Sequence, residues 1–266
     1  MEREDNTETV LCDARDIASA FVAARRSGAA ISHYPGAAPH DLASAYAIQD
    51  AALALWEREV GGWKVGRINP PRDAELGADR LVGPAFSDTI LAAGSAAPFP
   101  VFRGGFAAAE AEFMLRLAPQ DGPLPATPQE AMAWVDEVRI GIEIASSPYA
   151  RINADGPCVT ISDHGNNAGL LLGPVVPRAQ WDALDAVEVT LAIDGTEVGR
   201  ATTATMLDGP FGAVAFLLAN LTRRGFAIKP GWWVSSGAIT GVHVVAPGSA
   251  VVAGFGKLGS VETLIG

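Results

Sequence analysis

Residues 107–117 read Ala-Ala-Ala-Glu-Ala-Glu-Phe-Met-Leu-Arg-Leu, and residues 139–145 read Arg-Ile-Gly-Ile-Glu-Ile-Ala. Both runs have the apolar character of β-strands. Side chains two residues apart on a strand project from the same face. Glu110 and Glu112 therefore point the same way, and Glu143 lies on the face of its strand opposite the isoleucines. If the two strands face one cavity, three carboxylates converge in it.

Three convergent carboxylates make an all-oxygen site for a hard divalent cation, Mg²⁺ or Mn²⁺. The alternative is that Glu110, Glu112 and Glu143 are solvated side chains on an open sheet face. Their spacing alone does not separate these two interpretations.

Composition narrows the class of protein. Of the 266 residues, 49% are hydrophobic and 18% are charged, as in a globular protein with a sizeable core. The net charge of -11, with no basic stripe, argues against a nucleic-acid partner. The N-terminal residues have no apolar signal core, and the apolar stretch around Phe211–Leu221 is shorter than a membrane span of about 18 residues. Cys12 and Cys158 fit no zinc or redox spacing. We expect a cytoplasmic protein without a membrane partner.

The pattern of elements predicts the fold class. Helical spacing predicts helices at 13–28 and 41–60, and later ones at 128–136 and 211–224. Strand-like runs lie at 63–67, 107–117, 139–145, 158–162, 169–173, 187–193, 196–204, 231–235 and 250–255, with a hairpin signal at Asp194-Gly195. Many strands without regular helical crossovers argue against a doubly wound sheet. We predict an α+β fold in which an N-terminal helical region (1–61) covers a β-rich, mixed-strand roll or barrel (62–266).

An ordered set of segments resembles the hydratase and decarboxylase branch of the fumarylacetoacetate hydrolase superfamily, the 2-oxopent-4-enoate hydratases and 4-oxalocrotonate decarboxylases. Each segment alone is a weak signal, but together they span almost the whole chain in order. They are Ala45-Tyr-Ala-Ile-Gln49, Gly62-Trp-Lys-Val-Gly66, Glu110-Ala-Glu112, Ile142-Glu-Ile144, the run from Asp163 to Gly173, Ser235-Ser-Gly-Ala-Ile-Thr-Gly241, Ala246-Pro-Gly248 and Phe255-Gly-Lys-Leu-Gly-Ser260.

The resemblance implies a β-roll with a divalent metal, usually Mg²⁺, held by three carboxylates that map onto Glu110, Glu112 and Glu143. It also implies a lysine beside the metal, Lys64, and a small 2-oxo acid as substrate. Such a substrate chelates a metal through its carboxylate and keto oxygens, and the metal stabilises an enolate as a Lewis acid. Hydration, vinylogous decarboxylation and C–C hydrolysis all use that chemistry, so the metal end of the site does not choose among them.

Other residues are candidates for contact with the substrate. Lys64 faces away from its neighbours in the strand, with Gly66 leaving room beside it, and we interpret it as a substrate-binding cation or a proton donor. The alternative is a surface lysine at a strand end. The substrate-binding candidates are Arg67, Asn166, Ser236 and Thr240, with plain turn chemistry as the alternative for the last three.

The chain departs from the family pattern at two positions that handle protons. Typical hydratases carry an Asp in a Pro-Asp-Phe-Gly-like segment, and by our alignment Val82 takes its place. The usual Asp-Asn-Ala-Ser of a later loop is Asp163-His-Gly-Asn166 here. We predict that His164 or Asp79 takes over the acid/base role, with His164 the better candidate because a free imidazole titrates near neutrality. The alternatives are that His164 is a solvated or structural side chain, and that the chain catalyses another reaction of the same metal-enolate kind.

These observations lead to a metal-dependent lyase of the hydratase type, acting on a small unsaturated 2-oxo acid or 2-hydroxydienoate of catabolic origin. A decarboxylase, tautomerase or C–C hydrolase of the same superfamily is the alternative. A non-catalytic partner subunit of a hydratase–decarboxylase complex is an alternative of another class, but the intact glutamates and Lys64 argue against it. We also expect a homo-oligomer built from dimers.

Overall fold

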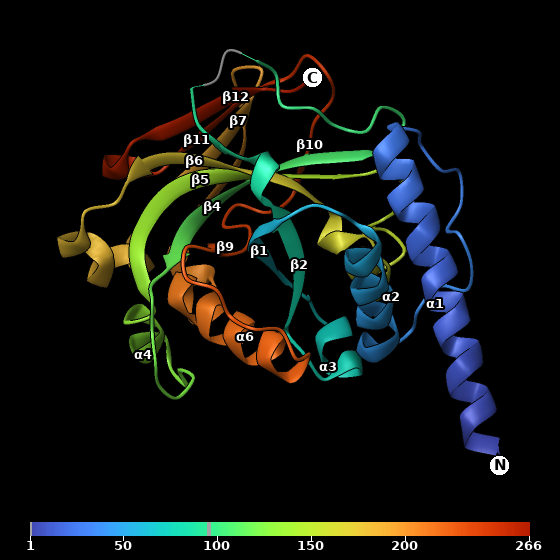
Figure 1. The fold of residues 1–266 in the computed structure, drawn as a ribbon. Helices are drawn as coiled ribbons and strands as arrows, with labels where there is room; N and C mark the ends of the chain where they lie inside the picture. Colours follow the sequence, from blue (N-terminus) through green and yellow to red (C-terminus); the bar gives the residue numbers. More distant parts are fainter. Residues whose placement is uncertain (1, 95–96) are drawn as a thin grey trace.

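Two helices lie at the N-terminal end of the chain. The computed structural model describes the backbone of residues 2–94 and 97–266, and side chains from residue 13 onward. Helices α1 (Glu2–Ser27) and α2 (Leu42–Leu55) pack against each other beside the sheet (blue in Figure 1) and share a buried apolar cluster. The predicted first helix is confirmed, whereas the second ends earlier than predicted because β1 begins at Val60. Cys12 lies outside the described side chains, and Cys158 is a buried free thiol.

A curved sheet forms the body of the molecule (Figure 1). Its eight strands among the described residues run in the order β2–β1–β9–β4–β5–β6–β3, with β10 paired to β4. Most neighbours are antiparallel, but β1 with β9 and β3 with β6 are parallel. The strands are β1 (Val60–Arg67), β2 (Arg80–Phe86), β3 (Ile90–Ala92), β4 (Phe106–Leu117), β5 (Val135–Ser147), β6 (Asn167–Val175), β9 (Trp233–Ser235) and β10 (His243–Val244).

A second, four-stranded antiparallel sheet packs against the first. Its order is β12 (Ser260–Leu264), β11 (Ala250–Gly254), β7 (Glu188–Ile193) and β8 (Thr196–Thr202). Phe113 of β4 and Phe255 meet between the two sheets, with ring centroids 5.5 Å apart. The predicted hairpin is confirmed, because Asp194 and Gly195 both adopt the positive φ angles, 52° and 78°, that a tight two-residue turn requires.

The remaining helices are short, apart from one. Helix α6 (Gly209–Arg223) lies across β1, β2, β4 and β9 and contacts α4 (Pro128–Met132). The others are α3 (Arg72–Leu76), α5 (Pro157–Ser162) and the 3₁₀ turns η1 (Ser87–Thr89), η2 (His164–Asn166), η3 (Arg178–Ala186), η4 (Thr203–Thr205) and η5 (Gly256–Leu258).

The strand predicted at 158–162 is wrong, because this segment is helix α5. Its β-branched residues favour a strand. However, Pro157 at the first helical position fixes a helical φ, and Gly156, the residue before the helix, has a φ of 103° that favours glycine. Among the described residues, one helical stretch, Thr203–Arg223, is long and apolar enough to span a membrane. Half of its most apolar window is buried inside the protein, as in the core helix of a globular domain.

The mixed pairing, the curvature and the helical layer confirm the predicted β-rich roll. The predicted division at residues 61 and 62 falls inside β1, so the helical region runs directly into the sheet. The division into two domains stays a prediction.

Candidate metal centre and active site

Strands β4 and β5 bring three glutamates together. In their antiparallel register Glu110 lies directly opposite Glu143, and Glu112 lies opposite Gly141. Directly opposed residues share one face of a sheet, so the three side chains project to the same side. All three are buried, and one carboxylate oxygen from each lies within 4.8 Å of the others. The convergence that the sequence predicted is therefore present in the fold.

The hydrogen bonds around the glutamates leave two oxygens open. Ser235 Oγ and the backbone N–H of Gly237, the latter at 2.8 Å, both donate to Glu112 Oε2. Asn167 Nδ2 donates to Glu143 Oε1 at 2.9 Å. Glu112 Oε1 and Glu143 Oε2 are buried without a hydrogen-bond partner among the described residues. A buried carboxylate oxygen without a partner is costly, so these two atoms mark where a ligand would be held.

Burial and mutual repulsion make the carboxylates hard to ionise together. Burial raises the pKa of Glu110 to about 7, with the charge of Glu143 adding to the effect and Lys64 opposing it. Burial, followed by the charges of Glu143 and Glu110, raises the pKa of Glu112 well above its usual value. A cation in the cluster would relieve both effects, because it favours the charged carboxylates.

Lys64 is the positive group beside the cluster. It lies on β1, is buried, and places Nζ 3.4 Å from Glu143 Oε1 and 3.5 Å from Asn166 Oδ1. Burial acts to lower its pKa, but the three glutamates outweigh burial and raise it, so Lys64 is an ammonium. Gly83 of β2 is the cross-strand partner of Lys64 and packs against the turn at 164–165. A Cβ atom at position 83 would lie 2.1 Å from the His164 carbonyl oxygen, so glycine is needed for this close approach.

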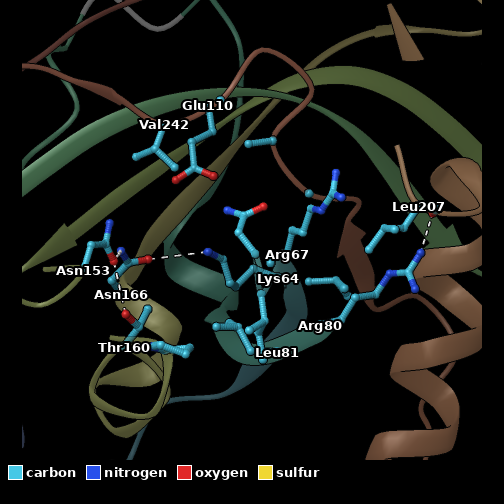
Figure 2. Close-up of a pocket in the computed structure, with 18 of the residues that line it drawn as sticks. Lys64, Arg67, Arg80, Leu81, Glu110, Asn153, Thr160, Asn166, Leu207 and Val242 are labelled. Atoms are coloured by element: carbon cyan, nitrogen blue, oxygen red, sulfur yellow. Dashed lines mark hydrogen bonds between the residues drawn. The ribbon is translucent and has the colours of Figure 1, made fainter. Parts of the chain in front are cut away.

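A cavity of about 900 Å³ opens onto this cluster. Lys64, Glu110 and Asn166 line it at the carboxylate end, and Ser236 and Thr240 contribute hydroxyl groups. Figure 2 shows Lys64 extending toward Asn166, while Arg80 extends the other way, toward Leu207. The Ser236 hydroxyl already accepts a hydrogen bond from Phe113 N–H at 3.1 Å. The Thr240 hydroxyl oxygen is buried without a partner in the described part of the chain and is therefore free to bind a ligand.

Arginines line the rest of the cavity. Arg67 and Arg80 are direct cross-strand partners at the end of β1 and β2, and both line the cavity, as does Arg72. Arg80 donates to the Leu207 carbonyl and lies 3.5 Å from Asp79 and 3.6 Å from Asp208. Arg67 has no ion-pair partner among the residues whose side chains the structure describes, 13–94 and 97–266.

Asp79 and Asp208 already balance the charge of Arg80, so Arg67 is the arginine of this pair whose charge favours an anion in the cavity. The sequence predicts Arg67 as a substrate-binding residue but does not single out Arg80. The signal available in the sequence is that Arg80 is a single charged residue at the start of an otherwise apolar run. In the structure this run is β2, and all of it is buried.

The structure does not place either predicted acid/base group in the cavity. The His164 imidazole is fully buried between the rings of Trp56 and Phe86, with centroids 6.2 and 5.4 Å away, and it does not line the cavity. Burial lowers its pKa, so the ring is neutral at pH 7. Asp79 has a half-exposed side chain outside the cavity lining. These placements argue against both assignments.

Strand β2 does not direct Val82, the residue aligned with the family Asp, toward the cavity. Val82 pairs with Val65 and shares its face, whereas Leu81 pairs with Gly66 and lines the cavity. Of these two neighbours, Leu81 faces the cavity and Val82 does not. Val82 is instead fixed through its backbone, donating to the Tyr46 hydroxyl at 3.1 Å and accepting from Gln49 Nε2 at 3.0 Å.

Comparison with known proteins agrees with this geometry. Residues 75–265 match the family described as fumarylacetoacetate (FAA) hydrolase C-terminal. The chain is 29% identical over 227 residues to 2-keto-4-pentenoate hydratase of Paraburkholderia xenovorans, covering 82% of each chain. It is 27% identical over 274 residues to 4-oxalocrotonate decarboxylase of Pseudomonas putida, covering 98% of each.

Solved structures share the fold. 4-Oxalocrotonate decarboxylase from Pseudomonas putida G7, complexed with calcium and acetate, aligns with a TM-score of 0.77 at 23% identity, covering 97% of this chain and 98% of that one. Fumarylpyruvate hydrolase from Pseudomonas aeruginosa, in complex with Mn²⁺ and pyruvate, aligns with a TM-score of 0.57 at 18% identity, covering 76% and 88%.

Proposed function

The chain belongs to the fumarylacetoacetate hydrolase C-terminal family, and from this premise we propose that it is a divalent-metal-dependent lyase acting on a small unsaturated 2-oxo acid. The observation that carries the proposal is the cluster of Glu110, Glu112 and Glu143 beside Lys64, at one end of a cavity large enough for such a substrate. The names of the hydratase and decarboxylase relatives support the substrate class.

The residues present fit a divalent cation. When all three glutamates are ionised they outweigh the single Lys64 ammonium by two charges, which one dication balances. The partnerless oxygens of Glu112 and Glu143 supply ligand atoms of the hard type that Mg²⁺ and Mn²⁺ prefer. Glu110, Glu112 and Glu143 would hold the ion, which would polarise the keto group of a bound 2-oxo acid. Solved relatives complexed with calcium, magnesium or Mn²⁺ support a divalent cation at this site.

The chain's own residues bind and orient the substrate. The Lys64 ammonium attracts the carboxylate next to the keto group and supplies a proton to the keto oxygen as it becomes an enol oxygen. The Asn166 amide oxygen holds the Lys64 amino group in place from the other side. The Thr240 hydroxyl donates to the same substrate carboxylate, which gives its buried oxygen a partner.

The far end of the cavity favours decarboxylation of a 2-oxo diacid over hydration. Conjugate hydration needs a group that delivers a proton to the remote carbon, yet Glu110 is the one carboxylate among the described residues lining the cavity, and no described histidine lines it. Loss of a remote carboxylate as CO₂ needs instead a group that binds this carboxylate and fixes its orientation to the conjugated system. Arg67, which lines the cavity, supplies such a group.

Hydration of a 2-hydroxydienoate is the second candidate, favoured by the hydratase relative at 29% identity. Metal-stripped enzyme reloaded with Mg²⁺ or Mn²⁺ would be given 4-oxalocrotonate and, separately, the dienol form of 2-keto-4-pentenoate. CO₂ release from the first substrate with little turnover of the second supports the proposal. If only the second substrate is turned over, by hydration, the chain is a hydratase and the decarboxylase proposal fails. Full turnover of either substrate in EDTA would contradict both proposals, because both require the metal.

An arginine variant tests the diacid specifically. Arg67→Met should raise KM for the diacid by about 10- to 100-fold, the scale of one hydrogen bond to a charged group, and leave KM for monoacid ligands unchanged. Arg178→Met is the matched control, because Arg178 stacks over Trp181 outside the cavity. Equal effects of Arg67→Met on diacid and monoacid would exclude a carboxylate site at Arg67.

A further inference from the structure

Arg25, in the last turn of α1, reaches out of the N-terminal helix into the sheet. Its side chain is 7% exposed, and it pairs with the fully buried Asp163 through two hydrogen bonds, Nε to Oδ1 at 2.5 Å and Nη2 to Oδ2 at 2.9 Å. The same guanidinium donates to the carbonyls of Asn167 and Ser146 at 3.1 Å each. Ser147 Oγ donates to Asp163 Oδ2 at 2.6 Å. Arg25 thus bonds to both ends of the turn 163–167.

That turn has an unfavourable backbone. His164, Gly165 and Asn166 have φ angles of 55°, 62° and 55°. Non-glycine residues adopt this left-handed region at a free-energy cost and keep it only where surrounding contacts enforce it. Within the turn, two backbone hydrogen bonds run among the described residues, from Asn166 N–H to the Asp163 carbonyl at 2.8 Å and from Asn167 N–H to the His164 carbonyl.

The turn delivers two side chains to the metal centre. Asn166 Oδ1 faces Lys64 Nζ, and Asn167 Nδ2 donates to Glu143 Oε1. The first contact orients the ammonium beside the carboxylates. The second directs Glu143 so that its other oxygen stays free. The geometry of Glu143 and Lys64 therefore depends on a turn that Arg25 holds at both ends.

We propose that Arg25 is a positioning residue for the metal centre, acting through Asp163 and the turn 163–167. Arg25 lies outside the family match at residues 75–265, so the N-terminal helix contributes to a site otherwise built by the β-roll. The inference rests on the proposed function in one respect, that the three glutamates bind a divalent cation. Groups that orient metal ligands commonly change metal affinity by about 10- to 100-fold when they are removed.

The test measures Mn²⁺ binding to metal-free protein by titration calorimetry and by the Mn²⁺ paramagnetic resonance signal. Arg25→Met alone would leave Asp163 as a buried unpaired charge, so the variant to use is Arg25→Gln with Asp163→Asn, which removes both charges. Asp163→Asn keeps the side-chain shape, whereas Arg25→Gln stays polar but is shorter and loses the forked guanidinium. Its Mn²⁺ dissociation constant should rise about 10- to 100-fold. Arg25→Lys, which keeps the charge but not the forked contact with both ends of the turn, should lie between it and wild type.

Arg26→Gln is the matched control. Arg26 is in the same helical turn and ties α1 to α2 through the Leu55 carbonyl at 2.9 Å and the Trp56 ring. The Trp56 ring packs on His164, but no hydrogen bond among the described residues joins Arg26 to the turn 163–167. A role limited to docking the helix would make Arg26→Gln weaken Mn²⁺ binding as much as the double variant, and that result would overturn the proposal. Unchanged Mn²⁺ affinity in the double variant, with only a lower Tm, would overturn it as well. Wild-type protein that binds no Mn²⁺ would refute the metal site itself, so the two failures are distinguishable.

Discussion

Replacing Glu110 by glutamine should make the metal-free protein more stable while removing its ability to bind metal. Burial raises the pKa of Glu110 from 4.5 to about 7. Between these two values the unfolded chain has lost a proton that the folded chain still holds, so stability falls as pH rises through this window. At pH 8 the buried charge costs up to about 3 kcal/mol, and below about pH 4 it costs nothing, because both states are then protonated.

Glu110→Gln keeps the shape of the side chain and removes this cost. In EDTA at pH 8 its Tm should rise by about 6–12 °C, on the scale of 2–4 °C per kcal/mol for a chain near this size, and at pH 4 it should match wild type. With Mn²⁺ at about 100 times the dissociation constant, wild type should gain about 2.7 kcal/mol and the variant far less. The control is Glu262→Gln, on an exposed position of β12, which should change neither quantity.

The assay is thermal unfolding followed by circular dichroism at both pH values, with EDTA or with Mn²⁺. A Glu110→Gln protein that is less stable than wild type in EDTA at pH 8 would refute the reasoning, because the carboxylate would then be stabilising without a cation. Equal stabilisation of variant and wild type by Mn²⁺ would place the cation elsewhere.

Further predictions concern the neighbouring groups. Lys64→Met should lower kcat/KM by about 10² or more and yet tighten Mn²⁺ binding, since a positive charge beside the cation is removed; unchanged kinetics in steady-state assays would contradict this. Asp79→Asn should leave kcat/KM within about twofold, because the side chain is half exposed outside the cavity, and a large loss would restore its acid/base role. Light scattering at micromolar concentration should show dimers or multiples of dimers, given the mean hydropathy of +0.21, and a strict monomer would contradict it.

The centre of the site could be predicted because it depends on strand periodicity. Glu110 and Glu112 share a face by the two-residue repeat, and Lys64 and Gly66 do so on β1, so local geometry alone places these side chains. The opposition of Glu110 and Glu143 depends on the register of two long strands, which their apolar pattern strongly constrains.

The rest depends on contacts between distant segments. His164 resembles a loop histidine in the sequence, and only the packing of Trp56 and Phe86 around it shows that it is buried. The left-handed turn that follows Asp163 is enforced by Arg25, 138 positions earlier in the chain, which no local pattern indicates. Helix α5 was predicted as a strand because β-branched residues outweighed the proline at its start.

The most direct test of the central claim is a crystal soaked in Mn²⁺ and measured at a wavelength where manganese scatters anomalously. We predict one strong anomalous peak per chain, within about 2.0–2.3 Å of carboxylate oxygens from Glu110, Glu112 and Glu143, that disappears in Glu110→Gln crystals. A wild-type map without a peak among these three glutamates, or with its strongest peak elsewhere, would contradict the claim that this chain is a metal-dependent enzyme.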